Sequence, residues 1–222
     1  MNMPRLITAA VTVVTLFILA AGYILFHPGV SFAETPLAQT PPTSFPQQGT
    51  FTVDPAHTSI GFDIGHLGLS RVQGRFDKMT GSLYADAKDI AKSNVNITID
   101  ASSIDTAVAP RDADLRSPNF FDVAKYPTLT FASTSIKKQG KGFTAVGNLT
   151  MKGVSKPVTI NFKVYGPIKD PWGNTRIGVV ANPLVIHRSA FGMTADANSV
   201  SDDVTVRLSL EATLNKETPE NK

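Results

Sequence analysis

Hydrophobic and polar side chains alternate along most of the chain between Phe51 and Leu214. A period of two is the pattern of β-strands that bury one face and expose the other. The segments SIGFDIGHL, NVNITID and PVTINFKVY all show it, and residues 204–212 show it most regularly. Strands therefore dominate the predicted fold.

Turn-forming residues separate these strand segments. A hairpin turn is predicted at residues 138–142, and a longer connection at residues 170–174. Neighbouring strands are therefore expected to be antiparallel. About seven to nine one-sided strands hide their hydrophobic faces most simply by closing into a barrel, which leaves no exposed edge. We predict an all-β fold, a closed antiparallel lipocalin-like β-barrel of about eight strands.

Residues 109–126, with the sequence APRDADLRSPNFFDVAKY, interrupt the alternation. Ser117 and Pro118 have the character of a helix N-cap and first helical residue, and Pro118 would also end a preceding helix. Short helices are therefore predicted near residues 110–125. On an all-β domain, the adjacent Phe120 and Phe121 would form a plug or lid over one mouth of the barrel.

The N-terminal region differs in character from the rest of the chain. Arg5 precedes an uncharged, mostly hydrophobic run of 21 residues from Leu6 to Phe26, long enough to span a bilayer as a helix. The small residues Ser31 and Ala33 instead fit a signal-peptide cleavage site. Both alternatives place the rest of the chain on the periplasmic side of a bacterial inner membrane, anchored or soluble. The predicted organisation is anchor or signal peptide at 1–33, Pro-rich linker at 34–49, barrel at 50–214 and polar tail at 215–222.

Composition and motifs exclude several classes of function. The net charge is only +3 and the basic residues are scattered, so no nucleic-acid partner is predicted. Cysteine is absent, which removes disulfides, thiolate metal sites and cysteine nucleophiles. Common hydrolase, metalloprotease and nucleotide-binding motifs are also absent, and His57, His66 and His187 have no neighbour at metal-ligand spacing. We therefore predict no enzyme activity, no metal and no cofactor.

Two polar residues share a strand face with hydrophobic ones. His66 has the parity of Ile64, and Arg188 that of Ile186, so both should point inward. His66 could be satisfied by backbone or a hydroxyl, or could contact a ligand head group. Arg188 could recognise a phosphate or carboxylate, or could extend out of the core to water.

Large hydrophobic side chains at interior positions are abundant, and each could simply pack in the core. Their combination with one-sided strands, an aromatic plug and little catalytic machinery favours a ligand cavity instead. A long prenyl chain would suit it, because each buried methylene contributes roughly 0.8 kcal/mol. The predicted ligand-binding residues are Phe62, His66, Leu115, Phe120, Phe121, Phe131, Phe162, Arg188 and Phe191.

Several separated motifs between Phe51 and Leu214 resemble the YceI-like polyisoprenoid-binding family. They are DPAHTSIGF at 54–62 with His66-Leu67, Arg75-Phe76, Leu115-Arg116-Ser117 with Phe120-Phe121-Asp122, Tyr126-Pro127, Thr130-Phe131, GNLTMKGV at 147–154 with Pro157-Val158, and RSAFG at 188–192. The resemblance implies an extended lipocalin-like barrel whose tunnel takes an isoprenoid chain, with polar groups near the entrance meeting its head group. It also implies no catalysis and a possible homodimer.

The leading hypothesis from the sequence is therefore binding, for transport or storage, of a long-chain isoprenoid such as a polyprenyl phosphate or an isoprenoid quinone. The N-terminal segment would place this domain beside the membrane. Two alternatives stay open. One is a redox accessory that acts on a bound quinone through His66 and Arg188, and the other is a periplasmic interaction or stress-protective module with a solid core.

Overall fold

The structure is a computed structural model that describes residues 47–216. The chain divides into two compact units, Met1–Gln39 and Thr40–Lys222, and only the second contains described residues. The hydrophobic segment at 6–26 and most of the predicted linker therefore lie outside the described residues. Within residues 47–216, no helix has the length and hydrophobicity needed to cross a bilayer.

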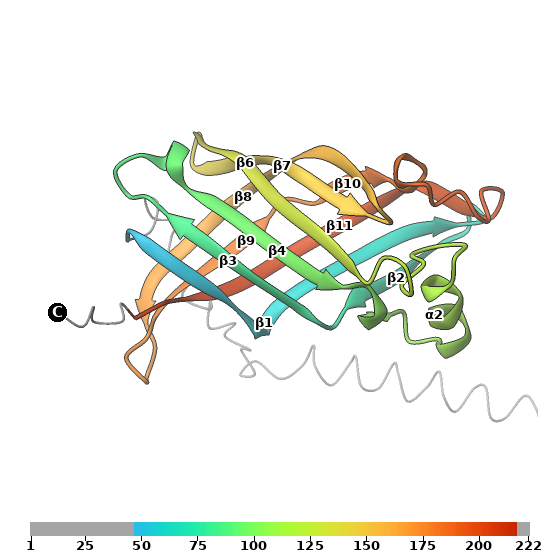
Figure 1. The fold of residues 1–222 in the computed structure, drawn as a ribbon, viewed down its shortest axis with the longest axis horizontal. Coiled ribbons are helices and arrows are strands. Elements are labelled where there is room, and N and C mark those ends of the chain that lie inside the picture. Colours follow the sequence, from blue (N-terminus) through green and yellow to red (C-terminus); the bar gives the residue numbers. More distant parts are fainter. Residues whose placement is uncertain (1–46, 217–222) are drawn as a thin grey trace, which may run out of the picture. The chain divides into compact units, whose positions relative to one another are not determined.

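Strands make up most of the described chain (Figure 1). Their bounds are β1 Gly49–His66, β2 Ser70–Phe76, β3 Met79–Ala85, β4 Asn94–Asp100, β5 Ile104–Asp105, β6 Thr128–Gln139, β7 Gly142–Met151, β8 Val154–Lys169, β9 Thr175–Ala181, β10 Leu184–His187 and β11 Val200–Leu214. One α-helix, α2 at Ala109–Arg116, and three short 3₁₀ helices, η1 Ile90–Lys92, η2 Ala101–Ser103 and η3 Arg188–Phe191, complete the described fold.

Eight strands form a closed barrel, as predicted from the alternation. Their order is β11-β9-β8-β7-β6-β4-β3-β1, and the pairing of β1 with β11 closes the ring. All neighbours are antiparallel. The closing pair spans Phe51↔Leu214 to His66↔Val200, with the register interrupted between Asp54 and Ser59. Closure leaves these strands without a free edge, which is the physical advantage that the sequence argument relied on.

Three further strands lengthen one side of the barrel. β2 continues the path of β3 and pairs with the second half of β1, while β10 continues the path of β9 and pairs with the first half of β11. β5 pairs in turn with β2. This extended wall, α2 and η3 lie at one end, which we call the α2 end. The opposite end, with the start of β1, the 170–174 turn and the end of β11, is called the Arg176 end (Figure 1).

The segment at 109–126 corrects one detail of the sequence prediction. It contains a single helix, α2, and Ser117 is its C-cap, not the N-cap of a second helix. The chain folds back after Ser117, because the backbone N–H groups of Phe121, Asp122 and Val123 donate to the carbonyls of Leu115, Ser117 and Arg116. Asp122 also adopts a positive φ of 49°, which a right-handed helix cannot include.

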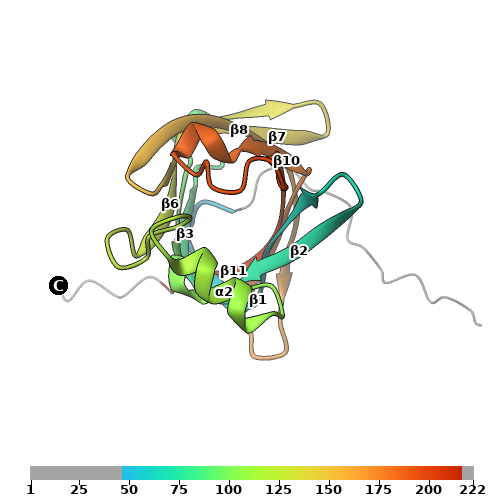
Figure 2. The same ribbon diagram turned by 90° about the vertical axis from the view of Figure 1, so that its right-hand side faces the viewer.

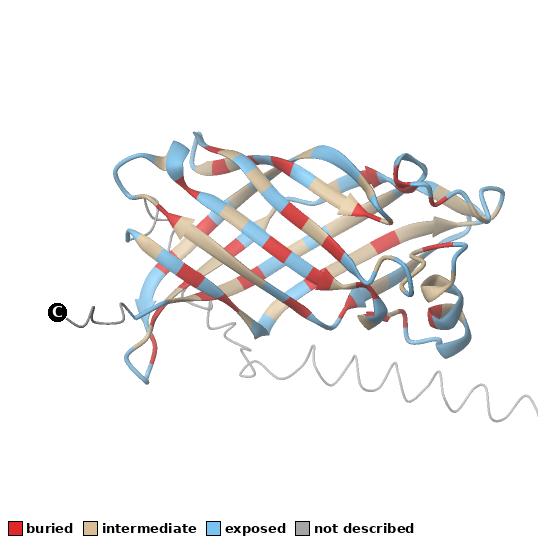
Figure 3. Cartoon of the chain, viewed as in Figure 1, coloured by how far each residue is buried: buried red, intermediate tan, exposed pale blue. Residues whose placement is uncertain are grey.

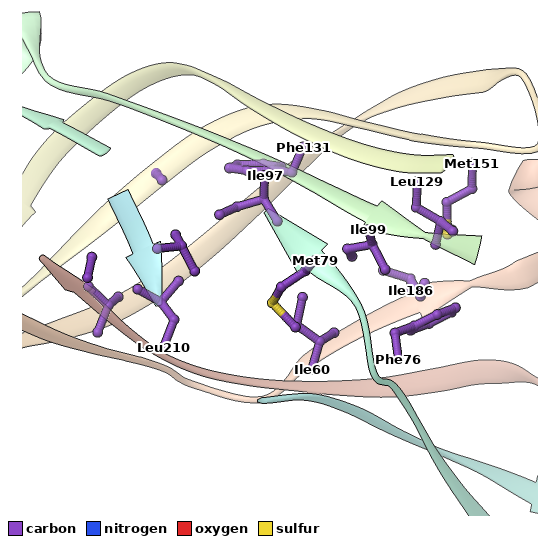
Figure 4. Close-up of a cluster of buried hydrophobic side chains, with 14 of the residues drawn as sticks. Ile60, Phe76, Met79, Ile97, Ile99, Leu129, Phe131, Met151, Ile186 and Leu210 are labelled. Atoms are coloured by element: carbon purple, nitrogen blue, oxygen red, sulfur yellow. The ribbon is translucent and has the colours of Figure 1, made fainter. Parts of the chain in front are cut away.

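Less and more accessible residues alternate along much of β6, β7, β8 and β9 (Figure 3). The buried hydrophobic side chains form one core that runs along the barrel (Figure 4). Phe51, Ile104 and Val164 are almost completely inaccessible to solvent. At the α2 end, by contrast, several inward residues stay partly accessible, which shows that the interior there is not filled by side chains.

Candidate functional site

The barrel contains a cavity of about 580 Å³. This volume falls within the range of roughly 300–1,000 Å³ that is usual for small-molecule sites. The hydrophobic strand residues of its wall come from nine strands: Ile60, Phe62 and Ile64 of β1, Val72 and Phe76 of β2, Ile97 and Ile99 of β4, Leu129 and Phe131 of β6, Leu149 and Met151 of β7, Val158 and Ile160 of β8, Ala181 of β9, Leu184 and Ile186 of β10, and Val200, Val204, Val206 and Leu208 of β11.

Polar lining residues are confined to the α2 end of this cavity. They are His66, Ser70, Thr106, Arg111, Asp114, Asn182, Arg188 and Asp196. Ser70, Asp114, Asn182 and Asp196 are also exposed to solvent, so the cavity opens among them. In Figure 2, which views this end, α2 and the segment that contains η3 lie on opposite sides of the opening. The cavity is therefore hydrophobic along its length and polar at its mouth.

His66 lies at the end of β1 and lines the cavity with its strand neighbours Phe62 and Ile64. Its inward direction follows from the strand parity. Among residues 47–216, no hydrogen bond is found for its imidazole, whereas His57 and His187 each contact an aspartate. The His66 ring is therefore available to a polar group in the mouth of the cavity.

Arg188 is buried beside the cavity and is held entirely by backbone oxygens. Its Nε donates to the carbonyl of Ser201, its Nη1 to those of Met193 and Ala195, and its Nη2 to that of Val200, at 2.6–3.1 Å. Neither role proposed from the sequence matches this arrangement completely. The guanidinium does not extend out of the core to water, and it does not keep two adjacent N–H groups free to bind a phosphate or carboxylate. A guanidinium has five N–H groups, so these four bonds leave one. Arg188 ties the 193–201 loop to η3.

Arg111 is a mouth residue that was not among the predicted ligand-binding residues. Its Nε donates to Thr106 Oγ1 and its Nη2 to the Thr106 carbonyl, both at 2.8 Å, and it lines the cavity. The buried Asp112 carboxylate fixes Thr106 by accepting from its N–H and hydroxyl. The sequence does contain a signal for this position, because Arg111 precedes the predicted ligand residue Leu115 by four residues and so shares its helix face.

The predicted aromatic lid is present. Leu115 of α2 and Phe120 and Phe121 of the following turns all line the cavity. The Phe121 ring packs edge-on against Phe76, with centroids 5.6 Å apart, and Phe76 lies 6.0 Å from Phe62. Phe62 in turn occupies the space above Gly74, where any side-chain carbon would collide with it. These contacts fix the lid on the extended wall.

Comparison with known proteins identifies the family. The model of the YceI-like domain matches residues 51–212, which is most of the chain and nearly all of the barrel. This chain belongs to the YceI-like family. UPF0312 proteins of Yersinia enterocolitica and Serratia proteamaculans are each 44% identical over 155 residues, covering 70% of this chain and 80% of theirs.

Solved structures agree with this YceI-like fold. BcnA of Burkholderia cenocepacia matches with a TM-score of 0.65 and 26% identity over 72% of this chain and 99% of its own. A YCEI protein of Campylobacter jejuni matches with a TM-score of 0.61 and 28% identity, over 68% and 90%. A polyisoprenoid-binding domain of Saccharophagus degradans has a TM-score of 0.60 at 17% identity, over 76% and 100%, which shows the shared fold.

The remaining predicted ligand residues of this YceI-like barrel lie deeper. Phe131 lines the main cavity and also a second cavity of about 60 Å³ towards the Arg176 end. Phe162 lines only the second cavity, where it stacks on Phe143 with centroids 5.6 Å apart. Phe191 is buried in the core and belongs to the lining of neither cavity. Phe191 was counted among the large hydrophobic residues at interior positions, but it lies in the 3₁₀ helix η3 and not in a strand.

The Arg176 end carries the main charged cluster of the barrel. Arg176 donates to Asp54 at 2.7 Å, Asp170 at 2.9 Å and Glu211 at 3.2 Å. The bond from Arg176, and then that from His57, lower the pKa of Asp54 to about 2. Burial disfavours the charged form of Asp170, but its bonds from Arg176 and Asn174 outweigh this and lower its pKa to about 2. These charges stabilise the fold, and none of them lines the main cavity.

A further ion cluster lies on the outer face of β1. Asp63 is buried between Arg71 and Arg207, which both hydrogen-bond to its carboxylate. Burial opposes its ionisation, but Arg207 and Arg71 together hold its pKa below the usual value. Asp63 alternates with the inward Phe62 and Ile64, so this cluster ties together three adjacent strands and does not reach the cavity.

Among residues 47–216, two groups of side chains have possible ligand atoms within 4.8 Å of one another, close enough for a metal ion. Asp54, His57 and Glu211 form one, but the Arg176 guanidinium already bonds both carboxylates and would repel a cation. His187, Asp202 and Asp203 form the other, fully at the surface. The Asp202 carboxylate there accepts from the N–H and hydroxyl of Ser189. Hydrogen bonding within the protein accounts for both groups.

Proposed function

We propose that this YceI-like domain binds one long-chain isoprenoid lipid, with its chain in the barrel and its head group at the α2 end. A polyprenyl phosphate or an isoprenoid quinone has the required shape. The observation that carries the proposal is the cavity of about 580 Å³, whose wall is hydrophobic and whose polar residues lie only at the mouth. The polyisoprenoid-binding domain of Saccharophagus degradans, which shares the fold, supports the same ligand class.

The mouth offers three polar contacts for the head group. These are the imidazole of His66, the uncommitted Nη1 of Arg111 and the remaining N–H of Arg188. All are hydrogen-bond donors in at least one protonation state, so they suit a phosphate or a quinone carbonyl. Acidic Asp114 and Asp196 share the mouth, which tempers its attraction for anions.

We propose binding without catalysis. The side chains with strongly lowered carboxyl pKa values, Asp54 and Asp170, belong to the Arg176 end and not to the cavity. Strongly shifted pKa values tend to mark reactive sites, so their location away from the ligand favours a carrier or store. The alternative of an interaction module required a solid core, and the cavity counts against it.

The proposed setting is the periplasmic side of a bacterial inner membrane, where isoprenoid lipids are at hand. It is supported by the hydrophobic run at 6–26, whether this anchors the protein or is removed. A homodimer is proposed on the family resemblance.

The test is mass spectrometry of an organic extract from purified residues 34–222. This part should fold on its own, because it holds the whole closed barrel and because 72% of this chain matches 99% of BcnA. After exchange into lipid-free buffer, one isoprenoid per chain is expected. An empty extract, followed by failure to bind added polyprenyl phosphate or quinone, would refute the proposal.

A further inference from the structure

The two cavities lie one after the other along the barrel, and the residues at their junction line both of them. The main cavity reaches the mouth at the α2 end, while the second is lined by Leu83, Ala85 and Leu210, towards the Arg176 end. Five residues line both cavities and therefore stand between them. We call them the Phe131 ring: Ile97, Phe131, Ile160, Ala181 and Leu208.

The Phe131 ring draws on five different strands, β4, β6, β8, β9 and β11. It therefore surrounds the interior instead of lining one wall. Phe131 is its largest member, and Ile97 is its direct partner in the pairing of β4 with β6. Figure 4 shows these two side chains close together within the barrel. The width of the passage depends mainly on this pair.

The Phe131 side chain is held in position from the neighbouring strand. A Cβ atom at Gly147 of β7 would lie 2.6 Å from the phenyl group of the Phe131 side chain and 2.5 Å from the Ala132 carbonyl oxygen. Only glycine at position 147 therefore leaves room for the phenyl group of Phe131. Because β6 and β7 pair continuously here, with Phe131 opposite Leu149, the Phe131 side chain is held in one position between the two cavities.

Beyond the Phe131 ring there is room for only a small part of a lipid. The second cavity holds about 60 Å³, against about 580 Å³ before it. An extended chain that enters at the α2 end therefore fills the main cavity and then meets the ring. We infer that the Phe131 ring sets the length of the isoprenoid chain that this protein accepts, with Phe131 as the residue that determines it.

This inference rests on the proposed function and adds a selection rule to it. A chain that is too long leaves carbons in water at the mouth, and a chain that is too short leaves part of the cavity wall uncovered. Each methylene not buried weakens binding by about fourfold. Affinity should therefore peak at one chain length, and that length should move when the passage is widened or narrowed.

The experiment measures the affinity of residues 34–222 for two series, prenyl phosphates and prenyl quinones, in which the head group is fixed and the number of isoprene units increases. Phe131→Ala joins the two cavities and is expected to move the preferred length up by at least one isoprene unit. Ala181→Val adds bulk to the same ring and is expected to move it down. Phe131→Leu, a milder change, serves if the alanine variant does not fold.

Phe143→Ala is the matched control. It removes the same type of buried side chain from the barrel, but Phe143 lines neither cavity, so the preferred length should stay that of the wild type. An unchanged optimum in the folded Phe131 variants, or an equal shift in Phe143→Ala, would overturn the inference and leave the proposed function standing. A wild-type protein that binds no member of the series would instead overturn the proposed function, and this inference with it.

Discussion

The two ends of the barrel are built from the same strands but serve different purposes. At the Arg176 end, Arg176 bonds three carboxylates from three separate segments, and the interior holds only a small cavity. At the α2 end, β1, β2, β10 and β11 outgrow the other strands, and α2 and η3 cover the space between without filling it. Packed hydrophobic side chains leave little space at one end, while an extended wall with a lid keeps the other hollow.

This difference shows how one barrel can be both stable and receptive. Side chains can fill an eight-stranded barrel, or it can hold one small ligand, and the two ends of this one come near to each case. Stability comes from the packed interior, in which Phe51 and Val164 are almost inaccessible to solvent. Substitutions at the α2 end or at the Arg176 end should separate these two properties, and the largest effect is expected in the main cavity.

Filling the main cavity should abolish its function without unfolding the barrel. Leu149→Trp places a large side chain in the wall of the main cavity. If it displaces even three methylenes of the ligand, affinity falls by roughly 50-fold, at about 0.8 kcal/mol each. Lipid content measured by mass spectrometry checks this. Val146→Trp, on the outer face of the same strand, should retain the lipid, and equal loss in both variants would contradict the location of the site.

Removing the hydrogen bonds that hold the η3 side of the mouth should cost stability. Arg188→Met leaves four backbone carbonyls without their donor, and a loss of roughly 3–5 kcal/mol in the free energy of unfolding is expected. Urea denaturation measures it. Arg75→Met, whose ion pairs lie at the surface, should change the midpoint little. A midpoint for Arg188→Met equal to that of the wild type would show that the 193–201 loop does not depend on this residue.

The Arg176 end should make the protein sensitive to acid. Asp54 and Asp170 have pKa values of about 2 in the folded protein, below the ordinary value of 3.8. A depressed folded pKa contributes stability that is complete above the unfolded value and is lost as pH falls through the folded one. The midpoint temperature of thermal unfolding should therefore decrease as the pH is lowered from about 4 to about 2.

Arg176→Gln tests the origin of this acid sensitivity. Without the guanidinium the two carboxyl pKa values should return towards 3.8, so the midpoint should fall less steeply over the same pH window. The variant should also be less stable than the wild type at neutral pH. A slope identical to the wild type would show that other groups cause the acid response. Lipid content at neutral pH should not change.

The smallest effect is expected at the β1–β2 turn. Leu67 and Leu69 are 56% and 85% exposed, and their neighbours His66 and Ser70 line the cavity. Leu67→Ser with Leu69→Ser should alter stability by no more than about 0.5 kcal/mol. If lipid passes through this end, its transfer to phosphatidylcholine vesicles should slow while the amount bound at equilibrium stays the same. Trp172→Ser, 78% exposed at the Arg176 end, is the control and should leave transfer unchanged.

Local patterns in the sequence predicted the fold well. The inward positions 204, 206 and 208 line the cavity, and Leu210 and Ala212 continue into the packed core. His66 follows the same parity. Where the chain leaves the strand, parity no longer applies, and this is why Phe191 was placed at the ligand and Ser117 at the start of a second helix. Arg111 was undervalued because its role depends on Thr106 and Asp112, which only the folded chain brings together.

The sequence by itself determined the strands, their inward faces, the closed barrel and the lid segment. Each follows from a repeat of two residues or from a local break in it, and such signals are carried by neighbouring residues. The tertiary structure alone decided that the interior is hollow at one end, that Arg188 bonds backbone oxygens and that five strands narrow the passage at Phe131. These properties depend on distances between residues far apart in the chain, and no local pattern encodes such distances.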